Sequence, residues 1–440
     1  MPALFDAALV KTLEEDKKFL ESTAVPIITV SATFHEDVKR FHHLSNNNTD
    51  HDTVFSRAHY SMALGIAVQA WGDKLDPAKA WLVDPTNYVS HEDWFSVTLT
   101  EKIGQQIARH PLLKTLKDFV DKFGRKKLPI LGSITPPLMY LTQKIHQPIL
   151  CFHIAAGNIL AIEGKKVFQM ITDPHVRDEY VENAAKGNIR FGVFDEATKF
   201  EFLEKAALHN KNVNPDHIIV TGPPVDPRVV AVRDKKYAWR SGPLKLCITT
   251  GGLGTNKQEI KKILEQLLPQ LRRRPSPYQL IVYASTHKDI AQMVRELASE
   301  YRVPLEAIGD KSAKLRLLYH PQIVDANELL IKYAFPWAHG FITKPSGDMA
   351  YDAAASGSFV LTLAEWGEWE ENIRKIFEQK GMSRKANVDN IVEQLEFLMS
   401  ARGKSQSWIE TAMLAAAKID RLFLNGSKKI IEAYKKFAEE

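Results

Sequence analysis

The chain has 440 residues, which is enough for two domains that each bury a core of their own. Its apolar, aromatic and charged fractions of 45%, 9% and 25% are those of a folded globular protein and argue against long disorder. The formal charge of +5 is small, and the basic clusters at 122–127 and 272–274 lack interleaved aromatic residues, so we expect no nucleic-acid partner. These clusters are solvated faces or, alternatively, a peripheral contact with an anionic membrane.

Cysteine usage and hydropathy favour a cytoplasmic protein. Cys151 and Cys247 each lie in an apolar run, which favours buried thiols in a reducing compartment over a disulfide or a zinc site. We expect neither a membrane-spanning helix nor a signal peptide, because no run of about 18 apolar residues occurs and segment 1–22 lacks a basic stretch before an apolar core. Membrane association would then be peripheral.

Short apolar runs alternate with helical segments in the first half of the chain. Strands are expected at 25–30, 79–83, 149–154, 167–172, 189–193 and 217–220. Helices are expected at 54–71 and 196–210, and 90–147 is mostly helical with a break at Pro136-Pro137. A polar, Asn-rich insert at 35–52 predicts a long loop. This alternation is typical of a parallel α/β sheet.

The turn-rich segment 221–227, TGPPVDP, predicts a linker between two domains, 1–226 and 227–440. The alternation then restarts, with strands at 244–249, 280–284 and 315–319, helices at 257–271, 287–302 and 328–335, and a helical tail at 387–440. We therefore predict an α/β fold of two tandem Rossmann-like domains.

The most informative segment is 340–373, GFITKPSGDMAYDAAASGSFVLTLAEWGEWEENI. An apolar strand leads into Lys344 and a turn containing Ser346 and Gly347, and Asp348 is placed to cap the next helix. The amide groups and dipole at such a helix start attract phosphate. Asp352 lies one helical turn later, within reach of a sugar hydroxyl. The alternative is an ordinary βαβ crossover followed by an acidic surface loop.

A glycine-rich turn follows the predicted strand at 244–249. Gly251, Gly252 and Gly254 allow the backbone to approach a pyrophosphate closely, and Thr255 leads into a long helix with open amide groups. Such a turn alone is weak evidence. Together with the segment at 340–373 it predicts a cradle for a nucleoside diphosphate.

The segment 340–373 resembles the nucleotide-sugar signature of glycosyltransferases related to monogalactosyldiacylglycerol synthase and the lipid-II-forming N-acetylglucosaminyltransferase. Those enzymes carry an ITK-A-G-x-G-T-x-x-E-A run and a later G-Q-E-x-x-N-V loop. Here 342–344 match outright, Asp352 stands at the acidic position, and Glu368 and Asn372 stand in the loop. Segment 221–227 is also similar to the family's T-G-I-P-I-D-P.

The resemblance implies a GT-B type fold with an interdomain cleft, the donor nucleotide sugar on the C-terminal domain and a hydroxyl acceptor, possibly a lipid, on the other. It implies a UDP-sugar donor, with Glu368 and Asn372 hydrogen-bonding the sugar. Glu368 belongs to an acidic cluster with Glu365, Glu370 and Glu371, which is alternatively a solvated charge run. Enzymes of this kind usually need no cofactor and no bound metal, and the histidines at 42, 43, 51 and 59 lack the spacing of zinc ligands.

Two residues are candidates for the catalytic base. The segment 58–63, AHYSMA, looks like the family's G-H-R-A-S-A, whose His contacts the acceptor side or the diphosphate, or serves as the catalytic base. The resemblance makes His59 a candidate base, although the preceding glycines are replaced by Phe-Ser-Arg-Ala at 55–58. Asp173 follows an apolar strand as the family's V-T-D does and could orient or activate the acceptor. The alternatives are a helix-capping or surface histidine and a helix-start carboxylate.

The predicted activity is glycosyl transfer from a nucleotide sugar to a hydroxyl. Two other functions fit the sequence. One is a nucleotide-sugar epimerase or hydrolase of the same fold. The other is a non-catalytic nucleotide-sugar-binding protein, which the lost glycines before His59 favour.

Overall fold

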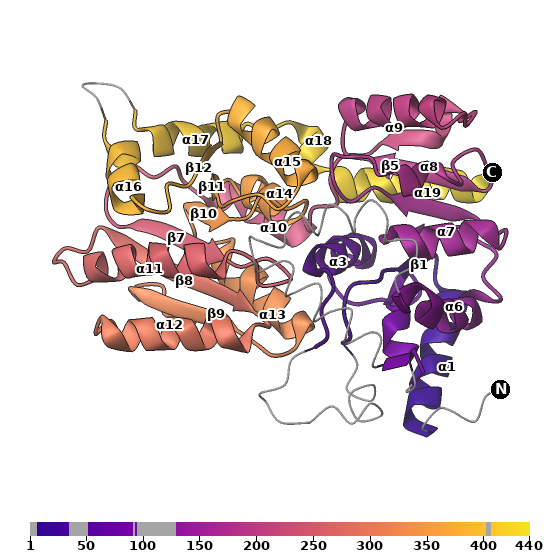
Figure 1. Cartoon of the computed structure of the whole chain (residues 1–440), viewed down its shortest axis with the longest axis horizontal. Helices are drawn as coiled ribbons and strands as arrows, with labels where there is room; N and C mark the ends of the chain where they lie inside the picture. The colour runs from indigo at the N-terminus through magenta and orange to yellow at the C-terminus, as the bar shows by residue number, and fades with distance from the viewer. Residues whose placement is uncertain (1–6, 35–51, 91–92, 95–128, 402–405) are drawn as a thin grey trace. The chain divides into compact units, whose positions relative to one another are not determined.

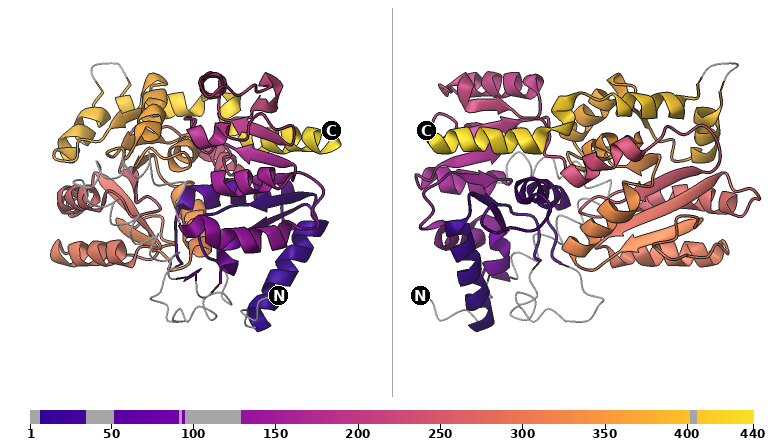
Figure 2. Two further views of the ribbon diagram at one scale, coloured as in Figure 1. Left: turned by 45° about the vertical axis from the view of Figure 1, so that its right-hand side comes forward. Right: turned by 180° about the vertical axis from the view of Figure 1, so that it is seen from behind.

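The computed structural model describes residues 7–34, 52–90, 93–94, 129–401 and 406–440. The backbone contacts divide the chain into two units, which we call unit 1 (Met1–Pro227 and Arg421–Glu440) and unit 2 (Arg228–Asp420). Each unit has its own parallel sheet covered by helices (Figures 1 and 2). Most of the Asn-rich insert and the basic cluster at 122–127 lie outside the described residues.

Unit 1 contains a six-stranded parallel sheet in the order β2-β1-β3-β4-β5-β6. Its strands are β1 (Val25–Ile28), β2 (Ala80–Val83), β3 (Ile149–Cys151), β4 (Val167–Met170), β5 (Ile189–Val193) and β6 (Ile218–Val220). Its helices are α1 (Ala7–Ser22), α3 (Arg57–Trp71), α6 (Pro129–Thr142), α7 (Ile154–Ile162), α8 (Asp178–Val181), α9 (Glu196–Leu208), α18 (Arg421–Leu424) and α19 (Gly426–Glu439), with 3-10 turns at Pro85–Tyr88 and Pro215–His217. The short helix α10 (Pro227–Ala231) spans the boundary between the units.

Unit 2 contains a second six-stranded parallel sheet in the order β12-β11-β10-β7-β8-β9. Its strands are β7 (Leu244–Thr249), β8 (Tyr278–Ser285), β9 (Leu315–Tyr319), β10 (Gly340–Thr343), β11 (Phe359–Thr362) and β12 (Ser383–Lys385). Its helices are α11 (Lys257–Leu271), α12 (Lys288–Glu300), α13 (Ile323–Leu329), α14 (Met349–Ala355), α15 (Glu368–Gln379), α16 (Ile391–Met399) and α17 (Trp408–Ala417), with a 3-10 turn at Arg233–Lys235 and a π-helical turn, η6, at Leu330–Ala334.

The strands read as apolar runs because helices cover both faces of each sheet. Every residue of β1, β4, β10 and β11 is buried, as expected of a parallel sheet at the centre of a doubly wound domain. The helix α11 shows the complementary pattern, because Ile260, Ile263, Leu264 and Leu267 are buried along one face. Two Rossmann-like domains, as predicted, are therefore the observed fold.

The strand order defines one switch point in each sheet, where successive connections run in opposite directions. In unit 1 this point lies between β1 and β3, and in unit 2 it lies between β7 and β10. Ligands of open α/β sheets bind beside the carboxyl ends of the strands at such points. The fold therefore directs attention to the loops that follow these four strands.

The last twenty residues belong to unit 1, whereas the sequence-based division had placed all of 227–440 in one C-terminal domain. The Tyr434 hydroxyl donates to the Pro148 carbonyl oxygen at 2.7 Å, which ties α19 to the start of β3. Gly222 has φ +85°, and a Cβ added there would lie 2.1 Å from the Leu422 carbonyl oxygen. The turn at 221–227 therefore packs closely against the returning chain.

Two local predictions were wrong. The helix α6 continues through Pro136-Pro137, because its buried residues Ile134, Leu138 and Leu141 hold it in the core on both sides of the prolines. The helix expected at 328–335 starts earlier, as α13, and ends in the π-helical turn η6. The strand β12 was not predicted. None of the described helices is long and apolar enough to cross a membrane.

Candidate functional site

The turn between β7 and α11 forms one side of the switch point in unit 2. The Gly254 amide donates to the Gly251 carbonyl oxygen at 2.9 Å, and Gly254 has φ +65°, a conformation that favours glycine. Gly252 lies within this turn. Thr255 closes this turn two residues before α11 begins, and it is 4% exposed. Its hydroxyl has no hydrogen-bond partner among the residues that the structure describes.

The segment after β10 forms the other side. The Thr249 hydroxyl donates to the Thr343 hydroxyl at 2.6 Å, which joins the ends of the two strands. Lys344 then reaches over the glycine-rich turn, because a Cβ added to Gly251 would lie 3.3 Å from Lys344 Cε and 3.8 Å from its Nζ. The structure thus brings together two predicted motifs that are about ninety residues apart in the chain.

A buried carboxylate holds the Lys344 ammonium. Glu370 Oε1 lies 2.6 Å from Lys344 Nζ, and its side chain is 2% exposed. Its other oxygen accepts from the Trp366 amide at 2.7 Å. Sequence reasoning had assigned Glu370 only to a general acidic cluster. It is instead the buried counter-ion of Lys344.

The other glutamates of the acidic cluster either form ion pairs or are exposed. Glu365 pairs with Arg374, and Glu371 pairs with Lys375 at 2.9 Å. Glu368, the predicted sugar ligand, is exposed as the first residue of α15, and Asn372 lies one turn later on the same helix. Only part of this acidic cluster is therefore a solvated charge run, which was the alternative interpretation.

The predicted cap at Asp348 is replaced by a neighbouring residue. Asp348 makes no side-chain capping bond, whereas the Ser346 hydroxyl accepts from the Met349 amide at 3.3 Å and donates to Asp348 Oδ1 at 2.6 Å. The Asp348 backbone is already helical, with φ −102° and ψ −62°, so it lacks the extended conformation that a capping residue usually has. Asp352 lies in α14 and is 8% exposed, so only a small part of its carboxylate surface is accessible.

Two residues at the same edge were not found from the sequence. His287, after β8, lies with its Nε2 3.2 Å from the Gly251 carbonyl oxygen and so borders the glycine-rich turn. The neighbouring Thr286 is 1% exposed, and its hydroxyl has no partner in the described part of the chain. Only the pairing of β7 with β8 brings them to the turn, and no local motif marks them.

The switch point of unit 1 gathers a pair of histidines. His59 lies in the first turn of α3, and its Nε2 is 3.2 Å from the Thr172 hydroxyl at the end of β4. The His153 ring, which caps α7 after β3, lies 5.3 Å from the His59 ring between centroids. His153 was not predicted.

The chain segments before and after the Asn-rich insert meet at the bridge between Ala32 and Val54, three residues before α3 begins.

Asp173 follows Thr172 and lies beside the same cluster. Burial raises the pKa of Tyr180 to about 12, and the negative charge of Asp173 adds to this effect. The loop after β1 is held by Asp84, whose carboxylate accepts from the Ser31 amide at 2.7 Å and the Thr86 hydroxyl at 2.7 Å. Burial raises the pKa of the Asp84 carboxyl group.

Metal binding receives no support from these residues. In the described ranges, no group of three or more His, Cys, Asp or Glu side chains is arranged to hold a metal ion. The expectation that the protein works without a metal or cofactor stays a prediction.

No protein-family model and no curated protein matches the sequence. Solved structures do resemble the chain. One is a trehalose 6-phosphate synthase from Burkholderia multivorans, with 11% identity over 95% of this chain and 99% of that one, at a TM-score of 0.54. Another is a UDP-GlcNAc 2-epimerase from Neisseria meningitidis bound to UDP-GlcNAc, with 12% identity over 94% and 100%, at a TM-score of 0.53. These similarities define the chain as a two-domain α/β protein of the GT-B type. They do not single out the lipid glycosyltransferases.

Proposed function

We propose that the protein is a glycosyltransferase that moves a sugar from a nucleotide sugar, expected to be a UDP-sugar, to a hydroxyl acceptor. The observation that carries this proposal is the convergence of Thr255, Lys344 and the glycine-rich turn at the switch point between β7 and β10. A buried hydroxyl without a partner, an ammonium group and a helix start together match the needs of a diphosphate.

In this proposal unit 2 binds the donor. The Thr255 hydroxyl and the first amides of α11 donate to phosphate oxygens, and Lys344 neutralises their charge. Asp352 accepts from a ribose hydroxyl, and Glu368 and Asn372 hydrogen-bond the sugar. Glu370 positions Lys344 through their 2.6 Å ion pair.

Unit 1 supplies the base. The acceptor oxygen forms a bond to the anomeric carbon of the sugar while the bond from that carbon to the diphosphate oxygen breaks. The acceptor proton passes to His59, with Asp173 as the other candidate, and the nucleoside diphosphate leaves with the bonding electrons. Thr172, 3.2 Å from His59 Nε2, orients the imidazole.

A nucleotide screen tests the donor half of the proposal. The midpoint of thermal unfolding should rise with UDP, because a ligand that binds only the folded state stabilises it. The panel also contains GDP and dTDP, and Lys344→Met should reduce the shift. No shift with any of these nucleotides in the wild-type protein would contradict the donor site.

Product analysis tests the transfer itself. The protein is incubated with the donor that the screen identifies and with a panel of sugar, small-molecule and lipid hydroxyl acceptors. His59→Asn should lower kcat by about 100-fold or more, the usual contribution of a general base, with an unchanged Kd for the donor. If only Asp173→Asn has this effect, the base is Asp173.

The alternative with specific support is a nucleotide-sugar epimerase or hydrolase. The likeness to the UDP-GlcNAc 2-epimerase, at a TM-score of 0.53, is as close as that to the synthase at 0.54. Such an enzyme would convert the nucleotide sugar with no acceptor present, so product analysis on the donor alone distinguishes the two. Binding without turnover in either assay would indicate a non-catalytic protein.

A further inference from the structure

A second cavity lies at the opposite edge of the unit 2 sheet from the glycine-rich turn. It has a volume of about 560 Å³ and is lined by the amino-terminal ends of β7 and β9 and by the segments that precede β7, β9 and β10. Because β7 has six residues that rise about 3.3 Å each, its two ends are roughly 16 Å apart. This cavity is therefore separate from the proposed donor site.

The cavity is lined by six basic side chains and by no carboxylate. They are Lys235, Lys236, Lys245, Lys311, Arg316 and Lys332. Lys236 contributes least positive charge, because its Nζ already donates to the Phe335 carbonyl oxygen at 2.6 Å and burial lowers its pKa to about 7. Among the residues that the structure describes, none of the six forms an ion pair. The charges of Asp310 and Glu306 act on Arg316 from a distance without an ion pair, and their carboxylates accept from the Ser312 hydroxyl at 2.6 Å and from the Lys314 amide.

Arg316 is the central group of this cluster. Its side chain is 1% exposed, and its guanidinium lies 4.3 Å from the centre of the Trp337 ring. Nη1 donates to the Ile308 carbonyl oxygen at 3.0 Å, whereas Nε and Nη2 have no partner within the described ranges. A buried guanidinium with two unused donor atoms is costly unless a ligand completes it.

The neighbouring groups also favour an anionic ligand. Burial, together with the positive charges of Arg316 and Lys311, lowers the pKa of Lys245. Burial and the nearby lysines lower the pKa of His339 to about 4, so its ring is neutral. His339 Nδ1 accepts from the Lys245 amide at 3.1 Å, which leaves the proton on Nε2 as a further donor.

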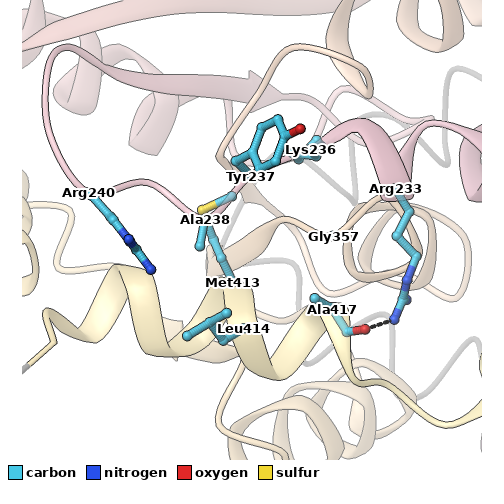
Figure 3. Close-up of a pocket in the computed structure, with 9 residues that line it drawn as sticks. All are labelled: Arg233, Lys236, Tyr237, Ala238, Arg240, Gly357, Met413, Leu414 and Ala417. Atoms are coloured by element: carbon cyan, nitrogen blue, oxygen red, sulfur yellow. Dashed lines mark hydrogen bonds between the residues drawn. The ribbon is translucent and has the colours of Figure 1, made fainter.

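An adjacent cavity of about 410 Å³ shares Lys236 and Tyr237 with this one, but its chemistry differs (Figure 3). Arg240 pairs with Glu410 at 2.8 Å, and Arg233 donates to the Ala417 carbonyl oxygen but keeps one buried nitrogen, Nη1, without a partner in the described ranges. The remainder of its lining is largely apolar. The larger cavity therefore differs in gathering more basic side chains and no ion pair.

We propose that the larger cavity is a second binding site, for a small ligand that carries a phosphate or diphosphate group. Its volume is that of a site for a small molecule, and the planar guanidinium of Arg316 and the surrounding ammonium groups suit phosphate oxygens. The Trp337 and Tyr333 rings in its lining offer apolar surface to the remainder of the ligand.

Inorganic pyrophosphate is the probe that tests this site, with calorimetry as the assay. The protein carries Lys344→Met throughout, which weakens the proposed donor site and leaves the cavity unchanged. Pyrophosphate should still bind. Adding Lys311→Ser and Lys332→Ser, two exposed positions, should weaken binding by about tenfold or more, because two nearby positive charges are lost.

The matched control removes two exposed lysines elsewhere in unit 2, Lys261→Ser and Lys375→Ser, which should change the Kd less than twofold. Equal weakening by both pairs would overturn the proposal, as would an absence of binding in the Lys344→Met protein. Arg316→Gln, provided that its circular dichroism spectrum is unchanged, should abolish binding. The result does not depend on whether UDP binds, so failure of the proposed function and failure of this site are distinguishable.

Discussion

The Thr255 hydroxyl provides the sharpest test of the donor site, because the same atom should affect stability and binding in opposite directions. It is 4% exposed and has no partner in the described part of the chain. A buried hydroxyl without a hydrogen bond costs about 1–3 kcal/mol. Thr255→Val replaces it with a methyl group of similar shape. The free energy of unfolding should therefore increase by about 1 kcal/mol, which raises Tm by roughly 2–4 °C in a domain of this size.

The same substitution should weaken nucleotide binding. A hydrogen bond to a charged phosphate contributes about 1.5–3 kcal/mol, so loss of the hydroxyl should raise the Kd for UDP by roughly 10-fold to 150-fold. Calorimetric titration measures the Kd, and thermal unfolding without ligand measures the stability. An unchanged Kd would refute the assignment of Thr255 to the diphosphate. A lowered Tm would show that the hydroxyl stabilises the free protein.

Thr23→Val is the matched control. Thr23 lies in unit 1 between α1 and β1, is 2% exposed, and also has a hydroxyl without a partner in the described ranges. Its replacement should raise Tm in the same way and leave the Kd for UDP unchanged. The pair therefore separates the effect of removing a buried hydroxyl from the loss of a ligand contact.

Three further substitutions test other parts of the structure. Glu370→Gln should lower the free energy of unfolding by about 2–4 kcal/mol, because it leaves the Lys344 ammonium without its buried counter-ion, and it should weaken UDP binding, since the ion pair that positions Lys344 is lost; urea unfolding and calorimetry measure the two effects. Gly222→Ala should destabilise by about 2–4 kcal/mol in urea unfolding, because its Cβ would meet the Leu422 carbonyl oxygen at 2.1 Å. Burial lowers the pKa of Lys236 from 10.5 to about 7, so the folded protein binds fewer protons than the unfolded chain between these values, and stability attributable to Lys236 rises with pH. The unfolding free energy of wild type minus that of Lys236→Met should accordingly increase from about pH 7 to pH 10.

Each of these expectations has a clear counter-result. For Glu370→Gln, an unchanged free energy of unfolding would contradict the expected loss. For Gly222 the control is Gly72→Ala, which has φ +79° and no atom within 4 Å of the added Cβ and so should cost only about 1 kcal/mol; equal losses at both positions would show that the contact with residue 422 is unimportant. For Lys236, parallel pH profiles would contradict the lowered pKa.

The sequence predicted the secondary structure correctly where neighbouring residues determine it. The strand at 244–249 and the helix at 257–271 have the bounds that were predicted, because apolar periodicity and a glycine-rich turn define them within a few residues. The two motifs of the candidate donor site were also predicted, since glycines and a strand-turn-helix pattern mark them. The prolines in α6 show the limit of local rules, because burial of one helix face outweighs the two missing amide donors.

The sequence by itself determined the two-domain α/β fold and the two motifs of the candidate donor site. Only the tertiary structure decided that Lys344 lies over Gly251, that Glu370 neutralises it, and that His153 faces His59. Only the tertiary structure decided as well that six basic side chains from separate segments line one cavity. The physical reason is that charge interactions depend on distance in space and burial, and neither can be read from positions separated by tens of residues in the chain.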